Sequence, residues 1–238
     1  MAALEDAHPW TRSMRTLTLS LLKAHGLQQA SAVLDAGCGT GLFLRDFRDT
    51  FAPSLEAGID FAWPALPFAA HRTSALLAGA SADALPFRDG SFDAVHSADV
   101  LQHMTIAGAL GAMREFRRVL KPGGLAALRL RATRRFIPNA PDVDFDHAYS
   151  ETSLRSSLST VGFQVLFLRR VNVLPSLAAE LTYTPPDPDA PVKGIALRSE
   201  SDARGKVLSA YLAFERGWLR AGMPTPGVGH TLLAIAKT

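Results

Sequence analysis

The residues best suited to ligand chemistry lie between positions 33 and 41, in the stretch Val-Leu-Asp-Ala-Gly-Cys-Gly-Thr-Gly. Its apolar start predicts the end of a buried strand, and the three alternating glycines let the backbone turn tightly and approach a ligand closely. Apolar residues from Leu42 to Phe47 suit a helix that packs back on that strand. A ligand at such a strand-to-helix turn lies against free backbone N–H groups. We therefore expect five residues of the turn to contact a ligand: Asp35, Ala36, Gly37, Cys38 and Gly39.

The spacing of the glycines narrows the class of ligand. It is G-x-G-x-G and not the G-x-G-x-x-G of a dinucleotide site, because position 42 is leucine. Asp35 stands just before the glycines, where its carboxylate would repel a pyrophosphate and attract a ligand that carries an ammonium and a sulfonium. S-adenosylmethionine meets that description. A tight turn in another α/β protein, or in a nicotinamide-dependent oxidoreductase, is the alternative.

Further polar positions follow later predicted strands. The apolar stretch 55–59 ends in Asp60, roughly 20 residues beyond the turn, where an acidic residue can hold ribose hydroxyls. We expect Phe61 to lie against the adenine or the ribose. Asp83 is placed to accept a hydrogen bond from an adenine amino group while the Ala84 N–H contacts the ring edge. Ala98, at the end of the predicted strand 92–98, completes the expected cofactor contacts.

Two more motifs follow in order, V-L-Q-H at 100–103 and R-R-V-L-K-P-G-G at 117–124. The ordered set resembles class I S-adenosylmethionine-dependent methyltransferases, of the small-molecule group that includes the ubiquinone and menaquinone methyltransferases. The resemblance covers about residues 30 to 170. It implies a Rossmann-like, doubly wound α/β sheet of seven strands with the last strand antiparallel. It also implies S-adenosylmethionine as cofactor and methyl transfer to a small organic acceptor. A cofactor-binding protein without transferase activity is a further hypothesis.

The element pattern is consistent with one domain over residues 1–238. Alternating strands and helices predict a parallel sheet, with strands at 31–36, 55–60, 75–79, 92–98, 124–131, 163–169 and 230–236. An apolar stripe predicts an N-terminal helix over 10–24, within a helical cap at 1–30. Residues 31–170 form the expected cofactor-binding core and 228–238 the last strand. The segment 172–227 is a predicted helical insertion between strands six and seven, with prolines in 183–191 and an amphipathic helix that ends at Gly222.

Methyl transfer from a sulfonium needs alignment more than a protein nucleophile, and a general base only if the acceptor must lose a proton. His103 is the candidate base because it follows the fourth strand at the ligand-binding edge; ordering its loop is the alternative role. Candidate substrate contacts are Asp99, Tyr149 and Trp218. Arg12 and Arg15 are candidates for the cofactor carboxylate. The set Asp142, Asp144, Asp146 and His147 resembles a metal cluster but falls in a polar loop, so we predict no metal.

Composition limits the remaining possibilities. The chain has 238 residues, 47% hydrophobic residues and a net charge of +3, and its arginines are scattered along the sequence. We therefore expect no nucleic-acid partner. Cys38 is the only cysteine, so no internal disulfide can form, and no apolar run is long enough for a membrane span. We expect a cytoplasmic monomer or homodimer. The sequence leaves open the acceptor and whether its oxygen, nitrogen or carbon is methylated.

Overall fold

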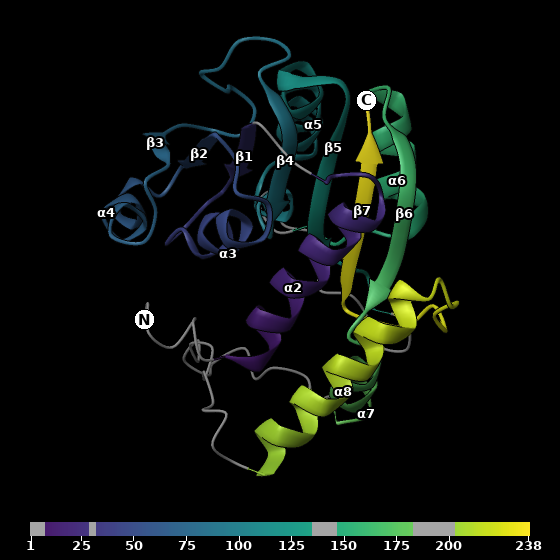
Figure 1. Ribbon diagram of the computed structural model, residues 1–238. Coiled ribbons are helices and arrows are strands. Elements are labelled where there is room, and N and C mark those ends of the chain that lie inside the picture. The colour runs from purple at the N-terminus through teal and green to yellow at the C-terminus, as the bar shows by residue number, and fades with distance from the viewer. Residues whose placement is uncertain (1–7, 29–31, 135–146, 183–202) are drawn as a thin grey trace, which may run out of the picture.

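A computed structural model of the chain describes residues 8–28, 32–134, 147–182 and 203–238 (Figure 1). The strands are β1 (Ala32–Ala36), β2 (Leu55–Asp60), β3 (Leu76–Gly79), β4 (Phe92–Ala98), β5 (Leu120–Arg131), β6 (Gln164–Val171) and β7 (Thr231–Lys237). The α-helices are α2 (Pro9–Ala24), α3 (Leu42–Phe51), α4 (Leu66–Ala70), α5 (Ile106–Val119), α6 (Glu151–Thr160), α7 (Val173–Leu181) and α8 (Ala203–Arg220). Two short 3-10 helices are η1 (Trp63–Ala65) and η2 (Leu101–His103).

The strands form one seven-stranded sheet in the order β3-β2-β1-β4-β5-β7-β6. The pairs from β3 to β5 are parallel, while β7 lies antiparallel between β5 and β6. The predicted fold class is therefore confirmed. Strand β5 begins at Leu120 and not at 124, because Leu120 already pairs with Phe92 across a bulge in the ladder. The K-P-G-G motif is thus part of an extended, irregular strand.

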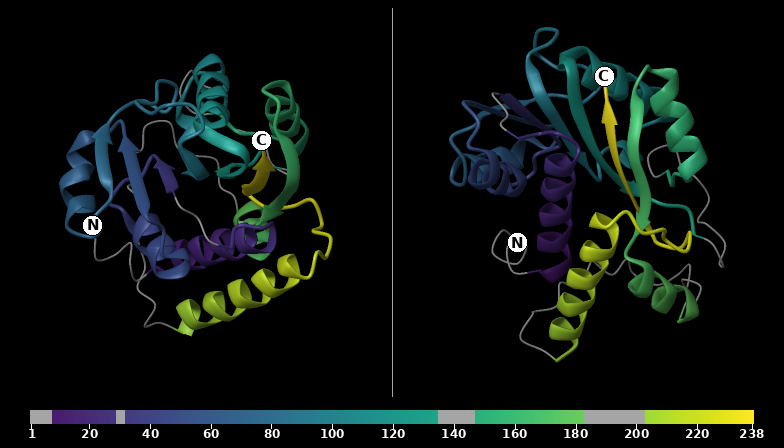
Figure 2. Two further views of the ribbon diagram at one scale, coloured as in Figure 1. Left: turned by 45° about the horizontal axis from the view of Figure 1, so that its top comes forward. Right: turned by 45° about the vertical axis from the view of Figure 1, so that its right-hand side comes forward.

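Helices cover both faces of the sheet, as the two views of Figure 2 show. Neighbouring residues of β1 alternate between the two faces: Val33 packs in the cluster that contains α2, α3 and α8 residues, and Leu34 in the cluster that contains α5 and α6 residues. All five residues of β1 are buried. Burial on both faces accounts for the continuous apolar strand that the sequence showed. The parallel direction of these strands brings the loops that follow them to one edge of the sheet.

Helix α2 fulfils the prediction of an N-terminal helix over 10–24. Pro9 occupies its first turn, where a missing N–H leaves no hydrogen bond unmade. Met14, Leu17 and Leu21 form the buried stripe, packed over the sheet face that β1 and β5 share with α3. The opposite, exposed side of α2 carries Arg12 and other polar residues. The helix therefore covers one face of the sheet and presents its charges outward.

The insertion between β6 and β7 contains two helices in the described part of the chain. Asn172 adopts a left-handed conformation (φ 66°) at the start of α7. The backbone N–H groups of Asn172 and Val173 donate to the carboxylate of Glu215 on α8, at 3.0 and 2.9 Å. A side chain from α8 thus caps the N-terminal end of α7. Residues 183–191 lie outside the described residues. Among the described residues, no helix is long and apolar enough to cross a membrane.

Candidate functional site

The glycine turn follows β1 and is tied to the end of β2. The N–H groups of Gly37 and Cys38 both donate to the carbonyl of Ile59, at 2.8 and 2.9 Å. Gly37 has a φ of 91°, and a Cβ there would overlap Cγ2 of Val100. Gly39 has a φ of 50°, but a Cβ there would meet nothing within 4 Å. The first glycine is therefore required by packing, whereas the second leaves open space over the turn.

Asp60 ends β2 and faces this turn. One carboxylate oxygen accepts from the Gly39 N–H and the other from the Ala62 N–H, each at 2.7 Å. The side chain is thus fixed between the glycine turn and the start of η1. Each carboxylate oxygen still has a lone pair for another donor. Asp60 can therefore hold a ligand hydroxyl without losing its orientation.

A cleft of about 370 Å³ opens beside Asp60, at the ends of β1, β2, β3 and β4. Six residues expected from the sequence line it: Gly37, Asp60, Phe61, Ala98, Asp99 and His103. The cleft lies at the carboxyl ends of the parallel strands on both sides of β1, where the chain reverses the direction of strand order. Open α/β sheets bind ligands at this place.

Asp35 does not line the cleft, contrary to the simplest expectation from its position. Its side chain is buried, and Oδ1 lies 2.7 Å from Nδ1 of His96 on the neighbouring strand β4. The His96 ring stacks on Phe43 of α3, with centroids 3.4 Å apart and an interplanar angle of 10°. Asp35 therefore supports the turn from behind.

Other predicted contacts also lie away from the cleft lining. Asp83 accepts a hydrogen bond from the Ser81 hydroxyl, and neither Asp83 nor Ala84 is among the lining residues. Tyr149 is half-buried behind η2, where its hydroxyl lies 3.5 Å from the Leu101 carbonyl. Burial raises the pKa of the Tyr149 hydroxyl. Tyr149 therefore lies behind the loop that carries His103 and does not line the cleft.

The wall of the cleft beyond β4 is stabilised by an ion pair. Asp99 has a φ of 59°, and its Oδ2 accepts from Nε and Nη2 of Arg129, at 3.1 and 2.5 Å. The guanidinium carbon of Arg129 lies 5.0 Å from the Trp10 ring centroid. This arrangement links the first turn of α2 to the cleft. His103, one turn after Asp99, is exposed and faces the same cleft.

Comparison with known proteins gives the family. A model of the methyltransferase domain matches residues 34–128. A malonyl-[acyl-carrier protein] O-methyltransferase of Geobacter sulfurreducens is 30% identical over 219 residues, 83% of this chain and 77% of that protein. The chain belongs to the family of class I S-adenosylmethionine-dependent methyltransferases. The family decides against the nicotinamide-dependent alternative.

Two further similarities agree with the assignment. A demethylmenaquinone methyltransferase of Roseiflexus castenholzii is 36% identical over 140 residues. That match covers 57% of this chain and 55% of the Roseiflexus protein. The chain thus spans about half the length of that relative. The crystal structure of Burkholderia thailandensis 1,6-didemethyltoxoflavin-N1-methyltransferase, with bound 1,6-didemethyltoxoflavin and S-adenosylhomocysteine, superposes with a TM-score of 0.58. It is 17% identical and covers 95% of this chain and 78% of its own, so it shows the shared fold.

The cleft is also lined by residues that the sequence did not indicate: Ile59, Ala62, Ala80, Ser81, Ala82, Val100 and Met104. Each of these residues lies at or just after the end of a strand or beside His103, so the predicted strand ends could have indicated them.

Cys38 is buried, and burial together with the charges of Asp35 and Asp60 raises the pKa of its thiol. A protonated, buried thiol is a poor nucleophile. Cys38 does not line the cleft, and its expected contact with a cofactor stays a prediction.

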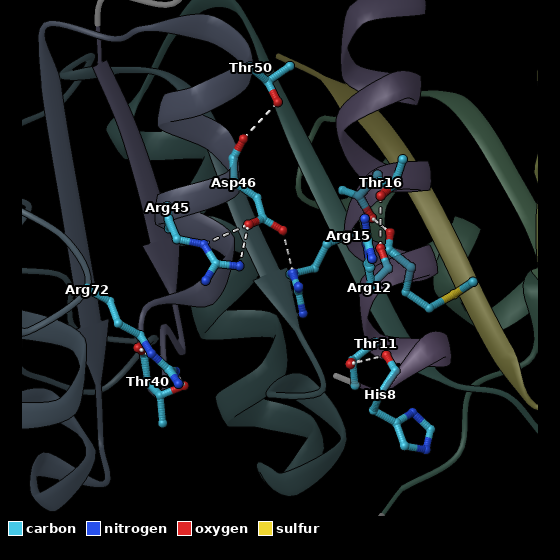
Figure 3. Close-up of polar contacts among 12 residues, drawn as sticks. His8, Thr11, Arg12, Arg15, Thr16, Thr40, Arg45, Asp46, Thr50 and Arg72 are labelled. Atoms are coloured by element: carbon cyan, nitrogen blue, oxygen red, sulfur yellow. Dashed lines mark hydrogen bonds and ion pairs between the residues drawn. The ribbon is translucent and has the colours of Figure 1, made fainter. Parts of the chain in front are cut away.

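The remaining candidate site residues are Trp218, the two arginines of α2 and the candidate metal cluster. Trp218 lies on α8 and lines a separate apolar hollow of about 330 Å³ between α7 and α8. Neither Arg12 nor Arg15 lines the cleft; Arg15 donates to Asp46 of α3 instead, at 2.7 Å (Figure 3). Positions 142, 144 and 146 lie outside the described residues. Within the described residues, no group of His, Cys, Asp and Glu side chains is arranged to hold a metal ion.

Proposed function

We propose that this methyltransferase binds S-adenosylmethionine in the cleft beside Asp60 and transfers its methyl group to a small organic acceptor by in-line displacement. The observation that carries the proposal is the fixed Asp60 carboxylate beside the open space over Gly39. A carboxylate oriented by two backbone N–H groups suits a pair of ribose hydroxyls. The family supports the same cofactor.

The residues around the cleft fit the rest of this cofactor. Phe61 is 84% exposed and stands next to Asp60, where its ring can cover an adenine or ribose. Ile59, Ala80 and Met104 supply an apolar lining for a flat ring. In this proposal Asp35 acts at longer range, since its carboxylate is held by His96. When bound, S-adenosylmethionine supplies an electrophilic methyl group that needs no protein nucleophile.

The contribution of the chain is then alignment, exclusion of water and, for an acidic acceptor, removal of a proton. His103 is the residue we assign to proton removal, because it is the histidine that lines the cleft among the described residues. Asp99 is engaged by Arg129 and forms a fixed polar wall. Alignment of this kind accounts for much of the acceleration in transfer between two bound molecules.

We further propose that the insertion contributes to acceptor binding through the hollow that Trp218 lines. Tyr211, Phe214 and Trp218 give this hollow an aromatic wall, with the rings of Phe214 and Trp218 5.9 Å apart. Small-molecule pockets are mostly apolar with few polar groups. The hollow and the cleft share no lining residue, so an acceptor that uses both must be elongated.

The test is calorimetric titration of the whole chain with S-adenosylhomocysteine and NAD, followed by a methyl-donor consumption assay. The acceptor panel contains phenols, amines and carboxylates, together with demethylmenaquinone and malonyl-acyl carrier protein, which the names of two relatives suggest. We expect S-adenosylhomocysteine binding and turnover of at least one acceptor class. Binding without turnover across the panel would favour a cofactor-binding protein, and NAD binding alone would overturn the proposal.

A further inference from the structure

A second concave surface, separate from the cleft, lies between α2 and α3 and has a volume of about 680 Å³. We call it the basic groove. Five cationic side chains from three helices line it: Arg12, Arg15, Lys23, Arg45 and Arg220. This cluster is not visible in the sequence, because the five residues are spread from position 12 to position 220. Folding brings α2, α3 and the end of α8 together and thereby concentrates their charge.

The carboxylates of the groove neutralise only part of this charge. Asp46 lies between two of the arginines, accepting from Nε of Arg15 at 2.7 Å and from Nη2 of Arg45 at 2.9 Å (Figure 3). Asp49 is the second carboxylate in the lining. Five cations against two carboxylates leave an excess of three positive charges, which equals the net charge of the entire chain. Positive and negative formal charges therefore cancel over the rest of the chain, and the net positive charge of the chain equals that of the groove.

Three of the cations are available for a ligand. Within the described residues, no carboxylate forms an ion pair with Arg12, Lys23 or Arg220, and all three side chains are exposed. The hydroxyls of Thr16, Ser20 and Thr50 also line the groove, but each donates to a backbone carbonyl of its own helix, so the charged groups are the donors left for a ligand. Guanidinium and ammonium groups are typical donors to phosphate oxygens.

The lining also excludes other kinds of partner. Leu19 is its one large apolar residue and it contains no aromatic side chain, so the groove offers no platform for stacked bases or an apolar chain. Arg12 and Lys23 are separated by three turns of α2, about 16 Å along the axis. A ligand that contacts both ends must carry more than one anionic group. The volume is in the range of small-molecule sites.

We propose that the basic groove is a binding site for a small molecule that bears a diphosphate or two phosphate groups. This site is distinct from the methyl-donor cleft, with which it shares no lining residue. The groove and the glycine turn are close along the chain, since Arg45 of the groove is one helical turn after Gly41. Arg72 also donates to Thr40 of that turn, at 2.6 Å (Figure 3). A bound anion would lie along α3 between Arg45 and Thr50, after the turn that follows β1.

The experiment is calorimetric titration of the full chain with inorganic pyrophosphate at constant ionic strength. The variant R12Q/K23Q removes two exposed charges, and R220Q removes a third from another helix. The matched control R114Q/K206Q removes two exposed charges outside the groove. We expect pyrophosphate to bind the wild type and the control equally, and R12Q/K23Q at least tenfold more weakly. R220Q should show a smaller loss.

Circular dichroism and thermal unfolding verify that each variant is folded. The titration is repeated with the cleft saturated by S-adenosylhomocysteine, and pyrophosphate affinity should be unchanged. Three results would overturn the proposal: no binding to the wild type at millimolar pyrophosphate, equal weakening in the control, or loss of binding when S-adenosylhomocysteine is present. The last would place the anion in the cleft. None of these outcomes depends on whether the chain methylates an acceptor.

Discussion

Asp35 and His96 form a buried pair that joins the two central strands directly beneath the glycine turn. They are opposite each other in the β1–β4 ladder, and Nδ1 of His96 lies 2.7 Å from Oδ1 of Asp35. The side chains are only 2% and 7% exposed. Because His96 also stacks on Phe43, the pair connects β1 and β4 to the helix that leaves the turn. The acidic residue of the motif therefore has a structural partner in addition to any effect on a ligand.

Replacing His96 with Phe should keep the stack on Phe43 and remove the hydrogen bond. The carboxylate of Asp35 would then be buried without a partner, and we expect a loss of about 2–5 kcal/mol in the free energy of unfolding. Urea denaturation followed by circular dichroism measures it. The double variant D35N/H96F should lose less than the sum of the single variants, because it leaves no charge buried. Additive losses would show that the two side chains are not coupled.

The sequence predicted the part of the site that depends on local pattern. Asp60 was identified because it ends an apolar strand at the expected distance from the glycines, and the structure places it in the cleft. His96 was missed as the partner of Asp35 because it lies 61 residues away and resembles any other residue of a buried strand. Pairs across a sheet depend on strand order and register, which a single sequence does not specify.

The insertion illustrates a second limit. The stretch V-L-P-S-L contains Pro175, which argues against a helix, yet a proline in the first turn of a helix is tolerated. The N–H groups at the start of α7 are satisfied by Glu215, 42 residues beyond Val173. The capping residue is thus distant in sequence. For the same reason Arg15 was expected near the cofactor carboxylate, although its partner is Asp46 on α3.

Replacing Asp60 with Ala should weaken S-adenosylhomocysteine binding by about 1–3 kcal/mol, the cost of removing one partner of a buried polar contact. The structure adds that the N–H groups of Gly39 and Ala62 lose their acceptor, so the turn should also become less ordered. Calorimetry measures the affinity. The control D89A removes a carboxylate that is 80% exposed and outside the cleft, and it should bind normally. Normal binding by D60A would exclude a direct cofactor contact.

The Cys38 thiol should react slowly with a disulfide reagent at pH 8, at least about a hundredfold slower than in guanidinium chloride, because its pKa is raised in the folded chain. The same shift predicts a loss of stability at high pH. The unfolded thiol ionises near pH 8.5 and the folded thiol does not, so unfolding becomes more favourable as the pH rises. Between pH 8 and 10 we expect about 2 kcal/mol more destabilisation in the wild type than in C38A. Equal losses in both proteins would contradict a raised pKa.

Replacing Trp218 with Ala should raise the KM for an acceptor about tenfold, with kcat and S-adenosylhomocysteine affinity nearly unchanged. The reason is that Trp218 supplies part of the aromatic wall of the hollow between α7 and α8 and does not line the cleft. Steady-state kinetics with an acceptor from the panel separates the two constants. Trp63, 71% exposed on η1, is the matched control. If W218A and W63A have the same KM as the wild type, the hollow has no part in acceptor binding.

Replacing His103 with Ala distinguishes a general base from a residue that orders the loop after β4. If His103 removes a proton from the acceptor, kcat should fall by about 10²–10⁴ and S-adenosylhomocysteine affinity should stay the same. H71A, which removes an exposed histidine outside the cleft, is the control. A fall in S-adenosylhomocysteine affinity together with the fall in kcat would instead assign His103 to the order of the loop.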